Sequence, residues 1–117
     1  MKSVLIAEDN HDLRTIFYKA FDNTDFDIRT AIDGQDAINQ IEQSLPDIII
    51  LDIDMPKITG LGVIDYIKNT NRDITIILVT GNALATDAPQ AQYVDLVLVK
   101  PVSIRELLTF VNRFATR

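Results

Sequence analysis

The sequence contains no cysteine, which excludes disulfide frameworks and thiolate zinc sites and is compatible with a reducing cytoplasm. Positive charge is scarce as well, because 11 Lys and Arg stand against 17 Asp and Glu and give a formal net charge of −6. General binding to nucleic acid or to an anionic membrane depends on clustered Lys and Arg, so this balance argues against both kinds of partner.

Long hydrophobic runs are also missing. The longest apolar runs are far shorter than the roughly 20 residues that a membrane-spanning helix needs, and Met1-Lys2-Ser3 leads directly into a strand-like run. We therefore expect a soluble, cytoplasmic protein without a signal peptide. Apolar residues make up 47% and charged residues 24% of the chain, which excludes a disordered or fibrous protein. The 117 residues fit one domain, residues 1–117, with a substantial core.

The chain does contain a regular alternation of short apolar runs with longer segments. Strand-like runs begin near residues 3, 26, 47, 74 and 95, and each gap is long enough for one helix with its loops. This alternation predicts an α/β fold whose parallel sheet is covered on both faces. The second run alternates polar and apolar residues, as in a half-exposed edge strand, whereas the runs at 48 and 76 are apolar throughout and indicate central strands.

Helical segments follow most of these runs, and several begin with a residue suited to an N-cap. Asn10, Asp33 and Ser103 take this position, the last in a capping-box pattern with Glu106. Apolar residues then recur at helical spacing. These are Leu13, Ile16, Phe17, Ala20 and Phe21 in the first helix, Ala37, Ile38, Ile41 and Leu45 before Pro46 in the second, Leu61, Ile64 and Ile67 in the third, and Leu107, Leu108, Val111 and Phe114 in the last.

The segment between residues 80 and 94 has a poorer pattern. Pro89 prevents one regular helix from running through residues 84–93, and its predecessor Ala88 is biased away from helical angles. We therefore expect five helices in all, of which the fourth is short, broken or displaced.

Polar residues suited to phosphate chemistry end four of the apolar runs. They are Glu8-Asp9, Asp52, Thr80 and Lys100-Pro101. The carboxyl ends of parallel strands share one edge of a sheet, where open α/β folds bind ligands. Each of these residues alone is more often an ordinary loop or capping residue. Their occurrence at the ends of four strands favours a common site.

The residue types at this edge indicate a phosphoryl-transfer site. A carboxylate such as Asp52 can attack phosphorus and form a mixed anhydride. Glu8 and Asp9 beside it would repel one another without a cation, and oxygen ligands indicate Mg²⁺ rather than zinc, with Mn²⁺ as a substitute. Lys100 would supply a mobile counter-charge, and Thr80 a hydroxyl donor with open space at the following Gly81.

These motifs together resemble the receiver domain of two-component response regulators over nearly the whole chain. They are Glu8-Asp9, Leu51-Asp52-Ile53-Asp54-Met55-Pro56 with Gly60, Thr80-Gly81 and Lys100-Pro101. The resemblance implies a five-stranded, doubly wound, flavodoxin-like sheet of order 2-1-3-4-5. It also implies that Asp52 accepts a phosphoryl group from the phosphohistidine of a sensor kinase or phosphotransfer protein.

The resemblance also implies roles for the residues around Asp52. Asp9 and Asp52 would bind Mg²⁺ through their side chains, Asp54 through its backbone carbonyl and Glu8 mainly through water. Thr80 and Lys100 would hold the phosphoryl oxygens. Asp54 and Asn82 match positions that set how fast the phosphoryl group is lost, and the Lys100–Pro101 peptide is similar to one that is usually cis.

The chain departs from the family pattern in its last third. Val97 occupies a position at which receivers commonly carry a Tyr or Phe that turns inward on activation, so this ring switch is absent. Tyr93-Val94 replaces a usual Gly-Ala, and Tyr93 either substitutes for the ring or, as burial preferences favour, simply packs. His11 is expected to be an exposed, partner-facing residue rather than a phosphodonor or ligand.

Three rival functions fit part of the pattern. A haloacid-dehalogenase-type phosphatase also uses Asp-x-Asp, a hydroxyl residue and a lysine around Mg²⁺, but its motif lies on an early strand and lacks the following proline. A pseudo-receiver binding module would keep the fold without cycling phosphate, yet such modules usually lose one or more of the five polar residues. A flavin carrier shares the strand order, although its phosphate would meet carboxylates.

The sequence thus predicts a phosphorylation-dependent signalling switch. The domain would catalyse its own phosphorylation and slow dephosphorylation without being a conventional enzyme. A change at Asp52 would bias a surface near the loop after Thr80 and the following helix, for a downstream protein target. No effector region follows the last helix, so we expect either output by protein docking or a longer parent protein.

Overall fold

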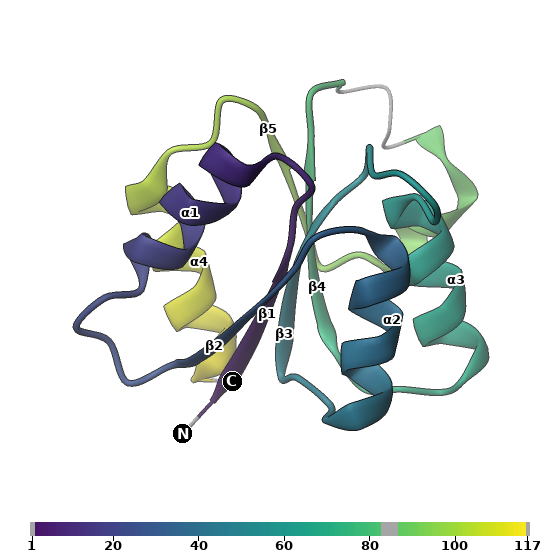
Figure 1. Cartoon of the computed structure of the whole chain (residues 1–117), viewed down its shortest axis with the longest axis horizontal. Helices are drawn as coiled ribbons and strands as arrows, with labels where there is room; N and C mark the ends of the chain where they lie inside the picture. Colours follow the sequence, from purple (N-terminus) through teal and green to yellow (C-terminus); the bar gives the residue numbers. More distant parts are fainter. Residues whose placement is uncertain (1, 83–86, 117) are drawn as a thin grey trace.

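A computed structural model of the chain describes residues 2–82 and 87–116. Its centre is a sheet of five parallel strands in the order β2-β1-β3-β4-β5, which confirms the predicted order (Figure 1). The strands are β1 (Ser3–Ala7), β2 (Asp27–Ala31), β3 (Ile48–Asp52), β4 (Thr75–Thr80) and β5 (Leu96–Val99). The edge strand β2 is partly exposed and β3 is buried along its whole length, as the alternating and continuous apolar patterns predict.

Helices cover both faces of this sheet. Figure 1 shows α1 and α4 on one face and α2 and α3 on the other. Their bounds are α1 (His11–Ala20), α2 (Gly34–Gln43), α3 (Gly60–Asn69) and α4 (Ile104–Ala115). Three predicted N-caps are confirmed, because the side chains of Asn10, Asp33 and Ser103 each accept a hydrogen bond from the backbone N–H three residues on.

Side chains alternate along the strands and divide the core into two halves. One half packs against α2 and α3, and its strand residues are Leu5, Ala7, Ala31, Ile49, Leu51, Ile76 and Leu78. The other half packs against α1 and α4, and its strand residues are Val4, Ile6, Ile48, Ile50, Ile77 and Val79. Because side chains alternate with a period of two residues, the face on which a residue just beyond the end of a strand lies follows from its position in this count.

The described part of the segment after β4 contains a 3₁₀-helix, η2 (Pro89–Tyr93), instead of an α-helix. The prediction of five helices is therefore corrected to four α-helices in the described residues, with η2 in the place of the fourth. Pro89 opens η2 and Ala88 is extended, as expected of a residue before proline. Residues 83–86, including the predicted helical position Leu84, lie outside the described residues.

Two predicted core positions are wrong. Ile16 has 51% of its surface exposed, because the sheet buries the neighbouring Phe17 and leaves Ile16 at the margin of the apolar stripe. Leu45 is also exposed, because α2 ends at Gln43 and the extended Ser44 directs the chain away.

A separate finding concerns membranes: none of the helices within residues 2–82 and 87–116 has both the length and the apolarity to cross a bilayer.

Candidate functional site

The carboxyl ends of the strands bring the predicted polar residues to one edge of the sheet, at the top of Figure 1. Ala7 is level with Leu51 in the β1–β3 pair, so Glu8 and Asp52 follow at the same height. Backbone hydrogen bonds continue past the strands here, from Glu8 N–H to the Ala31 carbonyl at 3.1 Å and from Lys100 N–H to the Thr80 carbonyl at 2.8 Å. The pairing of the strands thus sets the position of the site.

Three carboxylates form a cluster at this edge. Oxygen atoms of Glu8, Asp9 and Asp52 all lie within 4.8 Å of one another, and only Asp9 is exposed. The group therefore has two buried members and one at the solvent-facing side. A set of carboxylate oxygens with an open side suits Mg²⁺, which keeps part of its water shell when it binds a protein.

Lys100 provides the opposite charge inside the cluster. Its Nζ lies 3.4 Å from Oδ1 of Asp52 and 3.4 Å from Oε1 of Glu8. Partial burial acts to lower the Lys100 pKa, but the charge of Asp52 and then that of Glu8 outweigh it, and the net shift is upward. The side chain consequently carries its ammonium charge at neutral pH.

Glu8 is the carboxylate with the most unusual environment. Its pKa is raised to about 7, chiefly because burial disfavours the charged form and further because Asp52 is negatively charged. A hydrogen bond from the Asn10 N–H to Oε2 at 3.1 Å and the charge of Lys100 act in the opposite direction. Oε1 is buried and, within the described structure, accepts no hydrogen bond. Its charged neighbour is the Lys100 ammonium at 3.4 Å, which Glu8 shares with Asp52, so this oxygen has capacity left for a further cation or a water that binds one.

The alternation of side chains explains why Lys100 meets these carboxylates. Ile48 and Ile50 of β3 and Leu96 and Leu98 of β5 face α1 and α4. Every second residue of a strand points to the same face, so Asp52 and Lys100 also lie on this face. Thr80 extends the Ile76–Leu78 set and belongs to the opposite face. Lys100 and Asp52 therefore approach the crevice from one side and Thr80 from the other.

The buried Thr80 hydroxyl is engaged with the loop that follows β4. Its Oγ1 accepts a hydrogen bond from the Asn82 N–H at 3.0 Å and lies 3.2 Å from the Asn82 carbonyl oxygen, to which it can donate. Two predicted site residues, Thr80 and Asn82, are thus joined directly. Gly81 stands between them with open space around the position of a Cβ atom.

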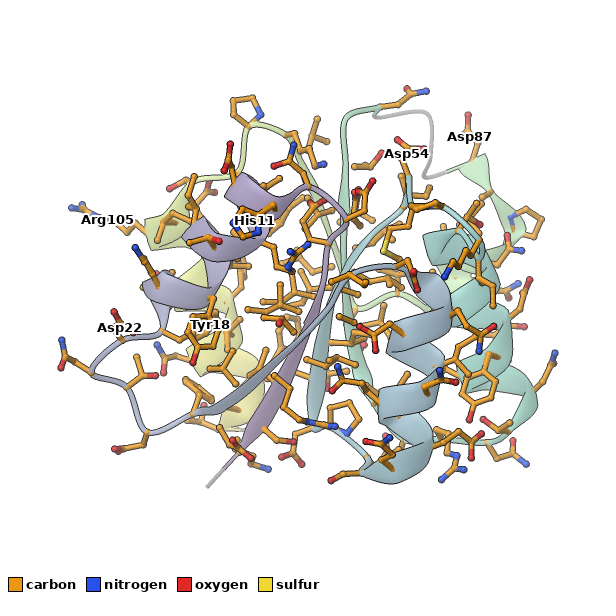
Figure 2. The ribbon with its side chains drawn as sticks, in the orientation of Figure 1. His11, Tyr18, Asp22, Asp54, Asp87 and Arg105 are labelled. Atoms are coloured by element: carbon orange, nitrogen blue, oxygen red, sulfur yellow. The ribbon has the colours of Figure 1, made fainter. Side chains whose placement is uncertain are left out.

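Asp54 lies in the loop that follows β3, and its side chain is exposed at the same end of the molecule (Figure 2). The Asp54 N–H points to Oδ1 of Asp52 at 3.4 Å. The start of the loop is fastened by hydrogen bonds from Ile53 N–H to the Val79 carbonyl and from Gly60 N–H to the Ile53 carbonyl. The backbone that leads into the expected metal-ligand carbonyl of Asp54 is therefore held by both peptide groups of Ile53 and by the Asp54 N–H.

The N-terminus of α2 packs against this loop, which sequence reasoning missed. A Cβ on Gly34 would lie 1.9 Å from the carbonyl oxygen of Ile58, so only glycine permits the contact. Beside it, the buried Asp33 forms an ion pair with Lys57, with 3.5 Å between Oδ2 and Nζ. Lys57 itself has a left-handed φ of 68°. The Asp33-Gly34 pair was a signal in the sequence, but it indicated only a helix start.

The other predicted positions are placed as follows. The Lys100–Pro101 peptide is cis, in agreement with the prediction. Val97 is partly buried against the core on the α2 and α3 face. His11 is exposed in the first turn of α1 (Figure 2). The ring of Tyr93 lies in η2 with the Lys68 ammonium of α3 at 4.8 Å from its centre, and 40% of the residue is exposed.

Comparison with known proteins identifies relatives over almost the whole chain. A family model described as the response regulator receiver domain matches residues 4–112. A probable transcriptional regulator, ycf27, from Guillardia theta is 36% identical over 110 residues, which cover 91% of this chain and 42% of that protein. The chain spans about half the length of most of the curated relatives it matches.

Solved structures agree with the sequence comparison. The response regulator TrrA from Thermotoga maritima, crystallised in complex with Mg²⁺ and BeF, superposes with a TM-score of 0.89 at 29% identity over 97% of this chain and 99% of that chain. A DNA-binding response regulator of the LuxR family from Staphylococcus aureus gives a TM-score of 0.87 at 34% identity over 97% and 98% of the two chains.

Proposed function

The chain belongs to the response regulator receiver domain family, and from this premise we propose that Asp52 accepts a phosphoryl group and that residues 1–117 work as a single switching domain. The observation that carries the proposal is the ion pair of Lys100 with Asp52, inside a cluster completed by Glu8 and Asp9. Asp52 is thereby a nucleophile that has a counter-charge, Lys100, and a cation site beside it.

The reaction assigned to Asp52 is an exchange of one bond to phosphorus. A carboxylate oxygen of Asp52 attacks the phosphorus of a phosphohistidine, the new O–P bond forms as the N–P bond breaks, and the electron pair stays on the imidazole nitrogen of the donor, which then takes up a proton. Because Lys100 and the Asp54 N–H both approach Oδ1, we assign the attack to Oδ2. In the separate dephosphorylation step, water attacks the phosphorus as the O–P bond to Asp52 breaks, and inorganic phosphate and the free carboxylate are released.

Glu8, Asp9 and Asp52 would hold the divalent cation, with the Asp54 backbone carbonyl as a further ligand and Glu8 acting mainly through water. When bound, Mg²⁺ supplies neutralisation of charge on the transferring phosphoryl group, and Mn²⁺ is expected to substitute for it. The cluster of three carboxylates with its one exposed member and the Mg²⁺–BeF complex of the relative TrrA support this assignment.

Lys100 and Thr80 would hold the phosphoryl oxygens once they are in place. Lys100 already reaches Asp52 and needs only a small shift of its ammonium. Thr80 would have to exchange its contact with Asn82 for one with a phosphoryl oxygen, which moves the backbone of Gly81 and Asn82. This coupling turns a local charge change into a surface change, and Val97 contributes no ring to it.

A groove beside Lys100 suits the protein that donates the phosphoryl group. It has a volume of about 470 Å³ and lies between α1 and the start of α4, with apolar walls. Its lining residues are Leu13, Ile16, Phe17, Lys100, Pro101, Val102 and Ile104. Since Lys100 both lines the groove and pairs with Asp52, a sensor kinase or phosphotransfer protein docked there would bring its histidine close to the acidic cluster.

In this function the domain acts in the cytoplasm as a switch for a downstream protein, without direct contacts to nucleic acid or membrane and without turnover of an independent substrate. It is therefore not a conventional enzyme. The complete set of Glu8, Asp9, Asp52, Thr80 and Lys100 favours phosphate cycling over a pseudo-receiver that only docks. Neither the phosphatase nor the flavin-carrier rival finds support in the family match.

The experiment that tests the proposal is incubation with Mg²⁺ and acetyl phosphate, followed by measurement of the intact mass. We expect the wild type to gain one phosphoryl group and Asp52→Asn to gain none. Asp22→Asn is the control, because Asp22 lies at the far end of α1 from the site (Figure 2). A gain in both wild type and Asp52→Asn, or in neither, would remove Asp52 from this role.

A further inference from the structure

Arg14 of α1 reaches back over the loop that carries two of the three clustered carboxylates. Its Nη1 donates to the backbone carbonyl of Glu8 at 2.9 Å and lies 3.3 Å from that of Asp9, to which it also donates. These carbonyls belong to the short connection between β1 and α1, residues 8–10. One guanidinium therefore contacts the backbone of both acidic residues.

The carboxylates on this connection are only partly neutralised without a divalent cation, because the single ammonium of Lys100 serves both Glu8 and Asp52. Glu8 and Asp9 lie close to Asp52, so three carboxylates share a small space, and like charges at such distances repel one another. Side-chain repulsion is relieved if the loop swings away from β3. The contacts of Arg14 oppose this movement because they fix two successive peptide groups to the first turn of α1.

The guanidinium is itself held in place from its other end. Arg14 Nη2 lies 3.1 Å from Nδ1 of His11, and because arginine has only donors, the imidazole nitrogen accepts. The first turn of α1 is further fixed by the Asn10 side chain, which accepts from the Leu13 N–H at 2.9 Å. The planar fork of arginine can serve these acceptors on two sides at once, which a lysine ammonium cannot do with the same geometry.

We propose that Arg14 is a positioning residue that holds the backbone of Glu8 and Asp9 so that their carboxylates stay beside Asp52 and bind a divalent cation. The proposal rests on the function proposed above for the acidic cluster, and no part of it requires Arg14 to touch the cation or the phosphoryl group. Its effect is preorganisation, in the way that residues outside a metal's ligand set support the ligands.

The charge of Arg14 and its hydrogen bonds predict opposite results on mutation. A positive charge near the cluster disfavours a second cation, so if charge alone mattered, Arg14→Gln would bind Mg²⁺ more tightly and Arg14→Lys would be unchanged. If positioning matters, both variants bind Mg²⁺ more weakly, because neither side chain can hold the two carbonyls as Nη1 does while it is itself fixed to His11 as Nη2 is. The sign of the change therefore separates the two explanations.

The experiment compares wild type, Arg14→Gln, Arg14→Lys and Arg105→Gln. Arg105 is an exposed arginine near the start of α4 (Figure 2) and serves as the matched control for loss of one positive charge. Mg²⁺ affinity is measured by calorimetric titration at a temperature at which thermal unfolding curves show all four proteins folded. We expect about a tenfold weaker affinity for both Arg14 variants, the usual scale for a supporting residue, and no change for Arg105→Gln.

Two further readings distinguish positioning from a general loss of structure. In phosphorylation by acetyl phosphate, the Mg²⁺ concentration for half-maximal rate should rise in both Arg14 variants while the rate at saturating Mg²⁺ stays within about twofold of wild type. The Asn10 N–H donates a hydrogen bond to Oε2 of Glu8. Without metal, amide hydrogen exchange at Asn10 should accelerate in both variants, whereas exchange in β3 should stay unchanged.

The outcomes separate failure of this proposal from failure of the proposed function. If the wild type binds no Mg²⁺ but exchange at Asn10 accelerates in the variants, the cation function fails and Arg14 still positions the loop. Unchanged exchange together with Mg²⁺ affinity within twofold of wild type overturns the role of Arg14. Tighter binding by Arg14→Gln alone overturns it in favour of a charge effect.

Discussion

The ammonium of Lys100 lies 3.4 Å from Oδ1 of Asp52 and the same distance from Oε1 of Glu8, so one cation links two buried carboxylates. Neither acid is neutralised by a partner of its own in this arrangement. The ion pair would have to loosen when either a divalent cation or a phosphoryl group enters the cluster. Lys100 is therefore both the counter-charge of the resting site and the residue free to follow the phosphoryl group.

Replacing Lys100 by Met should raise the Glu8 pKa further above about 7. The reason is that a nearby positive charge favours the ionised form of an acid, and its loss leaves the Asn10 N–H as the remaining influence that opposes burial and Asp52. The shift can be followed in metal-free protein by ¹³C NMR of the Glu8 carboxyl carbon during a pH titration. Lys19→Met, at the exposed last turn of α1, should leave the titration midpoint where it is, and an unchanged midpoint in Lys100→Met would contradict the ion pair.

Stability without metal should fall as the pH rises toward 7, because of Glu8. Its pKa is raised from 4.5 to about 7 on folding, so between these values the folded state binds more protons than the unfolded state and the free energy of unfolding decreases with pH. The contribution is fully present below pH 4.5 and is lost as the pH passes 7. The total change is on the order of 3 kcal/mol.

The measurement is urea unfolding of wild type and Glu8→Gln from pH 4.5 to 8 without divalent ions. The difference between the two curves isolates Glu8 from the other acids, and wild type should lose stability relative to the variant as the pH rises. Curves that stay parallel across this range would show that Glu8 has an ordinary pKa. Adding Mg²⁺ should restore part of the loss in the wild type, because a ligand that binds only the folded state stabilises it.

Asp9→Asn should weaken Mg²⁺ binding by at least about tenfold, since loss of a ligand should cost no less than loss of a residue that supports one. The same change should leave or slightly raise stability without metal, because it removes one of three clustered negative charges. Calorimetric titration and urea unfolding provide the two readings. Asp12→Asn, an exposed acid in the first turn of α1, is the control, and equal losses of affinity in both variants would argue for a general charge effect.

Gly34→Ala should destabilise the domain by about 2 kcal/mol or more, within or above the range for overpacking. A Cβ there would lie 1.9 Å from the Ile58 carbonyl oxygen, so α2 and the loop that follows β3 must separate. Gly81→Ala offers the control for stability, because nothing lies within 4 Å of its Cβ position. Thermal unfolding of both variants decides the matter, and equal melting temperatures would mean that the loop yields without cost.

Ile16→Glu should reduce phosphorylation by a sensor kinase that acts on the wild type, by about tenfold if the side chain contributes about 1.4 kcal/mol to docking. Phosphorylation by acetyl phosphate should be unaffected, because that small donor needs no groove. Ile32→Glu is a matched control, since Ile32 is 55% exposed compared with 51% for Ile16 but does not line the groove. A parallel loss with both donors would place the defect in the site rather than in docking.

Much of the fold could be predicted because its signals are local. The caps at Asn10, Asp33 and Ser103 act over three residues, and the period of apolar residues reports directly which faces are buried. The candidate site followed from the same reasoning, since parallel strands place their carboxyl ends together whatever their spacing in the chain. Two local predictions failed at the margins, where Ile16 and Leu45 are exposed.

What the amino-acid sequence determined by itself is the five strands, four of the five predicted helices, and the parallel arrangement of the strands. It also determined that Asp52, Lys100 and the Glu8-Asp9 pair converge at one edge. Short-range hydrogen bonding and burial decide these features. Only the tertiary structure decided that Lys100 bridges two acids, that Glu8 loses its solvent, that Gly34 meets Ile58 and that Arg14 holds the acidic loop. Each of these depends on the register of strands or on the packing of one element against another, and such distances are set by the whole folded core rather than by neighbours along the chain.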